Sequence, residues 1–241
     1  MRQLRIGVFG GTFDPVHQGH IEVALRVHSL LSLDWVDFVP AYCPPHKLDI
    51  PTANAWHRFA MLALATNEQE GLFVSTIELD TFQAVYTVET IRRLKQIWKE
   101  RAEFYFIIGA DSFEEITTWK DYERLLNSCH SAVMTRPGYS LKTEHLPETI
   151  RRQIVDLRDG FRMEKPEPGY HIYLCGSVSN PASSTAIRQA LRERRLVDGI
   201  PPVVLHHIEK YQLYRNADET RTTRTNFTRA GISGREPRHR H

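Results

Sequence analysis

Residues 4–20 read LRIGVFGGTFDPVHQGH, and this stretch decides the fold. Leu4–Phe9 is a short run rich in strand-forming residues, and Gly10 and Gly11 indicate a turn directly after it. Beyond Pro15, apolar residues recur at helical spacing through Leu31. The chain therefore opens with a β-loop-α unit.

Strands and helices continue to alternate along the rest of the chain. We expect strands at 36–40, 72–78, 104–108, 132–135 and 171–175 and helices at 56–66, 88–98, 184–195 and 203–213, with a proline-rich loop at 41–52, a helical stretch from 109 to about 127 and a polar insertion near 140–169. This order predicts an α/β fold, a Rossmann-like doubly wound parallel sheet with helices on both faces and C-terminal helices packed on it. Ligands of such sheets bind at the carboxyl ends of the strands.

Length and composition indicate one folded domain and a tail. The 241 residues are 41% hydrophobic, which is enough for one sizeable core. We expect a domain over 1–214 and a disordered, arginine-rich tail over 215–241, where apolar residues are too few to pack. No apolar stretch approaches the roughly 18 residues of a membrane span, and three scattered cysteines argue against a disulfide framework. We therefore expect a cytoplasmic protein that does not contact a membrane.

Charge is unevenly divided between these two parts. The tail holds seven arginines and three acidic residues, a charge of +4, so the total of +2 leaves −2 for residues 1–214. The domain therefore does not have the net positive charge of a nucleic-acid-binding protein, and no nucleic-acid partner is expected. An RNA contact through the tail is the alternative that this charge leaves open.

The first loop has the residues of a phosphate-binding site. Gly10 and Gly11 allow a ligand to approach the backbone, and the following helix begins with free N–H groups. His17 and His20 are three residues apart, so both can face one phosphate. The alternative interpretation of the same residues is a glycine turn followed by two surface histidines with no ligand. A zinc pair is less favoured because no third ligand has suitable spacing.

The string GGTFDPVHQGH, residues 10–20, resembles the signature of the HxGH nucleotidyltransferase superfamily in its nicotinate mononucleotide adenylyltransferase branch. The resemblance extends to about Arg215 through CPPHK at 43–47, VYTVETI at 85–91, IIGADS at 107–112, TTWKDYE at 117–123, TRPGY at 135–139 and SSTAIR at 183–188. It implies transfer of the adenylyl group of ATP to nicotinate mononucleotide, with release of pyrophosphate. The family's last motif usually opens with an apolar residue where this chain has Ala182, which is a mild departure from the family pattern.

The resemblance also implies the residues of the ATP site. It assigns ATP binding to Gly10, Gly11, Thr12, Phe13, His17, His20, Gly109, Asp111, Ser184, Thr185 and Arg188. His20, His17, Lys47 and Arg188 would be the catalytic residues, because they donate to or neutralise the phosphates. Read without the resemblance, SSTAIR also fits a capped helix with a surface arginine, Lys47 a solvated loop residue and Asp111 a helix cap.

The acceptor site is implied at Tyr86, Thr87, Trp119 and Arg136. A pyridinium ring gains stacking and cation–π attraction on an indole such as Trp119. The mononucleotide phosphate is already anionic, so it can attack the α phosphorus in line without a general base. Mg²⁺ is the expected cofactor, held mainly by substrate phosphates and not by protein ligands.

Two other members of the superfamily share the first motif, phosphopantetheine adenylyltransferase and glycerol phosphate cytidylyltransferase, but they are generally shorter. Trp119 and the TRPGY segment favour nicotinate. Class I aminoacyl-tRNA synthetases are excluded because the chain is too short and lacks a KMSKS-type loop.

Overall fold

A computed structural model describes residues 2–43, 52–135, 141–158, 169–176, 178, 180 and 182–215. The strands are β1 Leu4–Gly11, β2 Trp35–Pro40, β3 Leu72–Val74, β4 Ala102–Gly109, β5 His130–Met134, β6 Ile154–Asp156 and β7 Ile172–Cys175. The helices are α1 Gln18–Leu30, α2 Ala55–Thr66, α3 Thr87–Trp98, α4 Ala110–Glu114, α5 Tyr122–Leu126, α6 Glu148–Arg151, α7 Ser184–Arg192 and α8 Pro202–Tyr211. Short 3-10 turns lie at Leu79–Thr81, Lys99–Arg101 and Ile116–Thr118.

The seven strands form one parallel sheet in the order β3-β2-β1-β4-β5-β7-β6. Its direction of winding reverses between β1 and β4, so the carboxyl ends of these two strands flank the switch point where ligands bind. Those ends are Gly11 and Gly109. The predicted doubly wound fold is confirmed.

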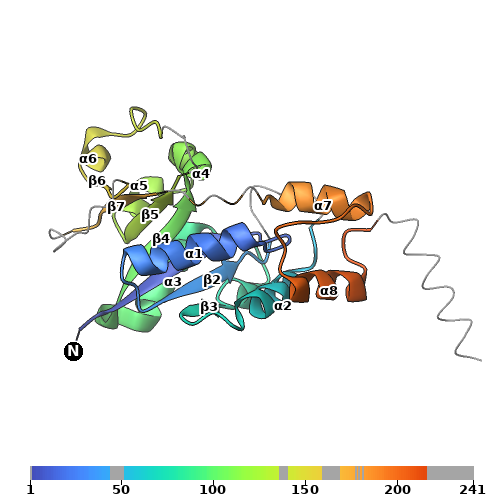
Figure 1. The fold of residues 1–241 in the computed structure, drawn as a ribbon. Coiled ribbons are helices and arrows are strands. Elements are labelled where there is room, and N and C mark those ends of the chain that lie inside the picture. The colour runs from blue at the N-terminus through green and yellow to red at the C-terminus, as the bar shows by residue number, and fades with distance from the viewer. Residues whose placement is uncertain are drawn as a thin grey trace, which may run out of the picture.

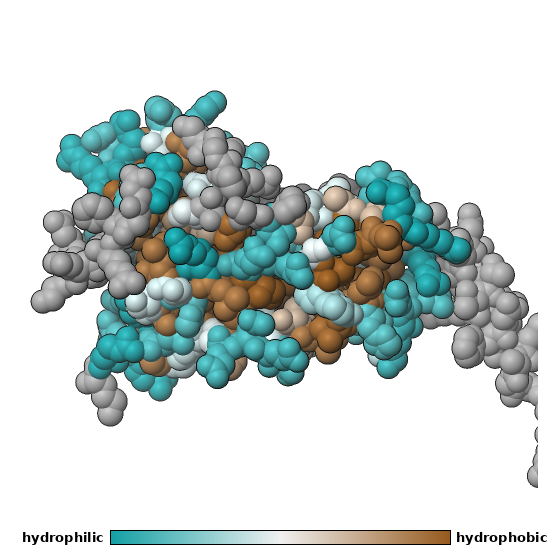
Figure 2. Space-filling model, viewed as in Figure 1, coloured by the Kyte–Doolittle hydropathy of each residue, from teal (hydrophilic) through white to brown (hydrophobic). Residues whose placement is uncertain are grey.

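Each face of the sheet carries its own apolar core. α1, α2, α7 and α8 pack on one face, where the core includes Val27, Met61 and Val204. α3, α4, α5 and α6 pack on the other, around Ile91 and Phe113. Figure 1 shows α7 and α8 together at one end of the molecule beside α2, and Figure 2 shows apolar side chains gathered between α1 and this end.

β4 and α3 show why the sequence adopts these elements. β4 reads AEFYFIIG, and its run of buried residues is typical of a strand covered on both faces. α3 buries Val88, Ile91 and Leu94 at helical spacing, and the charged residues between them are half-buried. None of the helices in the described ranges has both the length and the apolar content needed to cross a bilayer.

The glycine turn and the strand expected at 72–78 differ from the structure. Gly10 and Gly11 are the last residues of β1 and pair with Val39 and Pro40, so the loop begins at Thr12. β3 ends at Val74, because the backbone then turns toward α3. There Glu78 accepts a hydrogen bond of 2.6 Å from the Thr90 hydroxyl.

The stretch from 109 to about 127 is not one helix. It consists of α4, a 3-10 turn and α5, because Trp119 has an extended backbone with ψ of 146° and Asp121 a left-handed backbone with φ of 51°. The interruption brings Trp119 against Phe106, with ring centroids 6.1 Å apart.

The polar insertion near 140–169 is partly a component of the sheet. Its described residues form α6 and the edge strand β6, and Ile150 is buried in the core. β6 has only three residues, too few for a recognisable alternation of polar and apolar side chains. Residues 216–241, where the disordered tail was expected, lie outside the described ranges.

Candidate active site

A cavity of about 810 Å³ opens at the switch point of the sheet. It is lined by residues from the ends of β1 and β4, from the start of α1 and α7, and from the loops after β5 and β7: Phe9, Gly10, His17, Gly19, His20, Val23, Phe106, Ile107, Ile108, Gly109, Asp111, Ser112, Trp119, Met134, Thr135, Val178, Asn180, Ala182, Ser183 and Ser184. Seven of the residues predicted for substrate binding lie here, namely Gly10, His17, His20, Gly109, Asp111, Trp119 and Ser184.

His17 and His20 form a stacked pair at the start of α1. Their ring centroids are 3.6 Å apart with an angle of 29° between the planes. The His17 backbone N–H donates to Nδ1 of His20 over 3.2 Å, so a neutral His20 carries its proton on Nε2. That Nε2–H is the donor the ring can offer to a ligand in the cavity.

Burial keeps both imidazoles neutral. Desolvation lowers the pKa of His17 to about 4. Desolvation also lowers the pKa of His20 well below its ordinary value, and the neighbouring His17 adds to this effect. The pair therefore offers hydrogen-bond donors without carrying positive charge at neutral pH.

Gly19 leaves room for this packing. A Cβ at position 19 would lie 3.2 Å from the Nδ1 and Cε1 atoms of His17, tighter than most real contacts. The backbone N–H of Gln18 is already used, because it donates to the Gly199 carbonyl over 2.8 Å. The start of α1 therefore presents imidazole donors more than free backbone N–H groups.

The start of α7 lies across the cavity and offers backbone donors. No side chain caps this helix, so its first N–H groups remain available to an anion. The Ser184 hydroxyl donates to the Pro15 carbonyl over 3.0 Å and ties α7 to the first loop. Thr185 accepts from Arg188 Nη2 over 3.3 Å.

The other side of the cavity lies at the end of β4. A Cβ at Gly109 would meet no atom within 4 Å, so the space above this residue is open. Asp111 is exposed in the first turn of α4, and Trp119 is half-buried on Phe106. The cavity thus combines an apolar wall with a carboxylate, as a nucleotide requires.

The remaining predicted residues that the structure describes lie outside the lining of this cavity. Gly11 ends β1, and Thr12 and Phe13 follow it. Phe13 is buried, and its ring centroid lies 5.1 Å from that of His20. Tyr86 lines a separate pocket of about 220 Å³ with Lys120, whose Nζ is 4.6 Å from the Tyr86 ring centre, and Thr87 begins α3 beside it. Lys47 and Arg136 lie outside the described residues.

A buried polar network behind the first loop was not predicted from the sequence. Asp14 is 2% exposed and contacts Tyr214 and Arg188, and Arg58 is 1% exposed. Arg58 donates to the carbonyls of Thr12, Ala41, Tyr42 and Ala53. Asp14 stood within the first motif, whereas an arginine in α2 and a tyrosine after α8 carry no sequence signal of their own.

No group of three or more His, Cys, Asp or Glu side chains in the described ranges is arranged to hold a metal ion. Among the described residues, the cavity lining supplies one carboxylate, at Asp111, and the hydroxyls of Ser112, Thr135, Ser183 and Ser184. A divalent ion bound here would complete its coordination with substrate oxygens and water.

Comparison with known proteins gives consistent matches. A family model described as Cytidylyltransferase-like matches residues 8–190. A nicotinate-nucleotide adenylyltransferase of a Thermoanaerobacter species is 38% identical over 219 residues, covering 90% of this chain and 98% of the relative. One from Thermus thermophilus is 39% identical over 213 residues, covering 88% of this chain and 100% of the relative.

Solved structures show the same fold. The nicotinic acid mononucleotide adenylyltransferase of Plasmodium falciparum, in complex with NaAD, matches with a TM-score of 0.66 and 20% identity, covering 88% of this chain and 98% of that chain. A complex of the same Plasmodium enzyme with APC matches with a TM-score of 0.64 and 19% identity.

Proposed function

Because the chain belongs to the cytidylyltransferase-like family, within the group of nicotinate-nucleotide adenylyltransferases, we propose that its cavity carries out their reaction. The protein transfers the adenylyl group of ATP to nicotinate mononucleotide, giving nicotinate adenine dinucleotide and pyrophosphate. This is a step of NAD biosynthesis. The observation that carries the assignment is the stacked His17–His20 pair, which faces the start of α7 across the cavity at the switch point.

The phosphates of ATP bind between α1 and α7. Nε2–H of His20 donates to the α phosphate, where charge shifts during transfer. The free N–H groups of α7 hold the β and γ phosphates, with Thr185 and Arg188 at the end of this subsite. Lys47, in the CPPHK loop, neutralises the departing pyrophosphate.

The adenosine lies toward β4 and the acceptor toward Trp119. Gly109 leaves room for the base, and Asp111 accepts hydrogen bonds from the ribose. The pyridinium ring stacks on Trp119, and Tyr86 and Thr87 close the acceptor side. Arg136 is the further candidate for a contact with the acceptor phosphate.

Transfer proceeds by direct attack of the mononucleotide phosphate on the α phosphorus. The nucleophile is already anionic, so the protein positions the two substrates and stabilises charge without taking up a proton. Adenylyltransferases of this kind use a divalent metal with ATP, and we propose Mg²⁺, held mainly by phosphate oxygens. The ion supplies positive charge to the triphosphate.

The catalytic domain ends at Tyr214 in this proposal, and residues 215–241 are dispensable for transfer. Tyr214 supports this boundary, because its hydroxyl reaches Asp14 behind the first loop. Deleting residues 215–241 should leave the rate of dinucleotide formation unchanged. A large loss of rate would place part of the site in the deleted segment. We propose a cytoplasmic location, where ATP and the mononucleotide are present.

The acceptor decides between this function and the related ones. Pyrophosphate release is measured with ATP, Mg²⁺ and one acceptor at a time: nicotinate mononucleotide, nicotinamide mononucleotide or phosphopantetheine. We expect the highest kcat/KM with nicotinate mononucleotide. Activity with only phosphopantetheine would retain the ATP site and overturn the assigned acceptor.

A further inference from the structure

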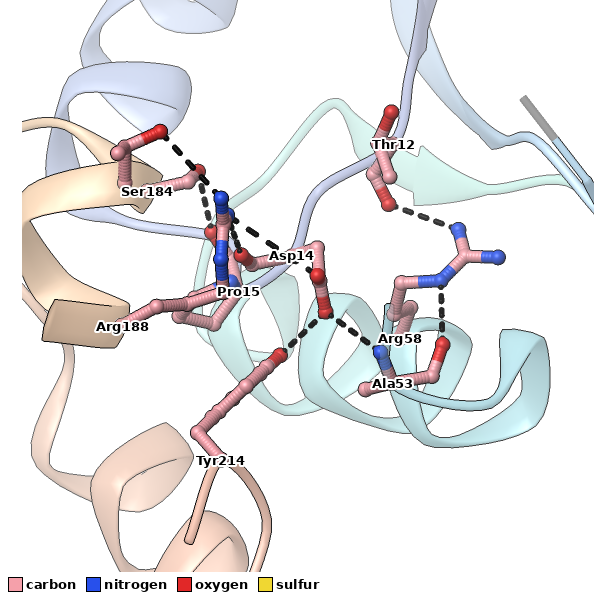
Figure 3. Close-up of polar contacts among 9 residues, drawn as sticks. Thr12, Asp14, Pro15, Ala53, Arg58, Ser184, Arg188 and Tyr214 are labelled. Carbon is pink, nitrogen blue, oxygen red and sulfur yellow. Dashed lines mark hydrogen bonds and ion pairs between the residues drawn. The ribbon is translucent and has the colours of Figure 1, made fainter. Parts of the chain in front are cut away.

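Asp14 lies at the centre of a buried network behind the phosphate-binding loop (Figure 3). Its contacts come from three distant parts of the chain: the segment before α2, helix α7 and the residues after α8. None of these contacts involves a residue that lines the cavity, so the network lies outside the cavity wall.

The two carboxylate oxygens of Asp14 have different surroundings. Oδ1 accepts from the Tyr214 hydroxyl over 2.6 Å and from the Ala53 N–H over 3.0 Å. Oδ2 is buried and has no hydrogen-bond partner among the described residues. Nη1 of Arg188 lies 4.0 Å from Oδ2, which is close enough for ionic attraction but too far for a hydrogen bond.

Arg188 is held beside this carboxylate by two further contacts. Nη1 donates to the Asp14 backbone carbonyl over 2.6 Å, and Nη2 donates to the Thr185 hydroxyl over 3.3 Å. The side chain is only 17% exposed. The guanidinium is therefore oriented by Asp14 on one side and by the first turn of α7 on the other.

The Tyr214 hydroxyl determines which oxygen of the Asp14 carboxylate faces Arg188. Its hydroxyl occupies Oδ1, so Oδ2 is the oxygen left toward Arg188. Burial and the adjacent Asp14 raise the pKa of Tyr214, so the hydroxyl stays protonated and remains a donor. Without it, Oδ1 would lose its short hydrogen bond and could draw Arg188 away from Thr185.

Arg58 also attracts the Asp14 carboxylate, which opposes the lowering of the Arg58 pKa by burial, but no hydrogen bond joins these two side chains in the described part of the chain. Its hydrogen bonds go to four backbone carbonyls, which join the loops after β1 and β2 to the segment before α2. This leaves Arg188 as the guanidinium nearest to Oδ2 in the described part of the chain.

We propose that Asp14 and Tyr214 are positioning residues for Arg188, so that the segment after α8 is a functional part of the ATP site. The proposal rests on the proposed function, in which Arg188 serves the ATP phosphates. Neither residue touches substrate. Their contribution passes through the guanidinium, so it should depend on the presence of Arg188.

A double-mutant cycle in the full chain tests this dependence. We would measure kcat and KM for ATP in wild type, Tyr214→Phe, Arg188→Ala and the double variant. Tyr214→Phe should raise KM for ATP about tenfold and change KM for the mononucleotide less than twofold, as expected for a lost hydrogen bond to a charged group. In the Arg188→Ala background the same substitution should change KM for ATP less than twofold.

Tyr211→Phe is the matched control, because Tyr211 is 50% exposed on α8 and makes no contact with Asp14. It should leave both KM values unchanged. Asp14→Asn provides a second variant if Tyr214→Phe fails to fold, and it should show the same dependence on Arg188. An equal effect of Tyr214→Phe with and without Arg188 would show a structural role only and would overturn the proposal.

Calorimetric binding of ATP by the same four proteins separates this proposal from the proposed function. Wild type could bind ATP and yet fail to use nicotinate mononucleotide, which would overturn the acceptor assignment alone. The four ATP affinities would still reveal whether Tyr214 acts through Arg188. Affinities that change independently would refute the coupling.

Discussion

Substitution of His20 tests how the histidine pair contributes to catalysis. His20→Ala removes the Nε2–H donor that we assign to the α phosphate. Loss of one such preorganised donor typically raises the barrier by about 3 kcal/mol, which corresponds to roughly a hundredfold loss of kcat. The His17 N–H loses its acceptor at the same time, which should destabilise the fold by only about 1 kcal/mol. The variant should therefore fold and turn over slowly.

The pH dependence distinguishes a neutral donor from a charged one. Because the pKa of His20 is well below its ordinary value, the ring stays neutral throughout the range from about pH 6 to 8.5. The ratio of wild-type to His20→Ala kcat should therefore stay constant over this range. The ratio cancels the titration of the substrate phosphates, which both proteins share.

The assay is initial-rate pyrophosphate release at saturating ATP, Mg²⁺ and mononucleotide. His20→Gln keeps an uncharged N–H donor and should recover part of the lost rate. His206→Ala is the control, since His206 is exposed on α8 and should have no effect. A ratio that falls about tenfold per pH unit above pH 6.5 would mean that His20 acts as an imidazolium, and the reasoning would be wrong.

Three further predictions concern stability and the acceptor. Arg58→Met should lower the free energy of unfolding, measured by urea titration, by about 3 kcal/mol or more, because four backbone carbonyls lose their buried donor. Arg152→Met, at an exposed position, is the control. Equal losses of stability in the two variants would refute the account. Burial lowers the pKa of His17 and of His130 to about 4, so as the pH falls the unfolded chain takes up protons before the folded one does. The contribution of these two histidines to the free energy of unfolding should therefore be complete above about pH 6.5 and decrease toward pH 4, by on the order of 3 kcal/mol at most per residue. His130→Asn should flatten that dependence in thermal unfolding, and an unchanged slope would count against it. Trp119→Ala should raise KM for the mononucleotide about tenfold through lost stacking, with KM for ATP unchanged; a rise in KM for ATP alone would place Trp119 in the wrong subsite.

Sequence patterns predicted the sheet and the cavity because both depend on local signals. The alternation of apolar strands and helices implied a parallel sheet, and its switch point placed His20, Gly109 and Ser184 at one edge. The strand β6 escaped prediction because three residues carry no clear periodicity. The break before α5 also escaped prediction, since its cause is the non-helical backbone of two residues, Trp119 and Asp121.

The network behind the first loop could not be predicted for a different reason. Asp14 and Tyr214 are 200 residues apart in the chain, and they meet in a fold in which α8 packs on α2. In the sequence, Arg58 has the pattern of an ordinary surface residue of a helix. Its burial comes from the loops after β1 and β2, whose carbonyls accept its hydrogen bonds. Tertiary contacts of this kind leave no periodicity in the sequence.

Product analysis tests the central claim most directly. Nucleotide-free protein is incubated with ATP, Mg²⁺ and nicotinate mononucleotide, and dinucleotide and pyrophosphate are quantified from the same sample. The account predicts that nicotinate adenine dinucleotide and pyrophosphate form in equal amounts. Phosphate release without dinucleotide, or dinucleotide formation with another acceptor alone, would contradict it.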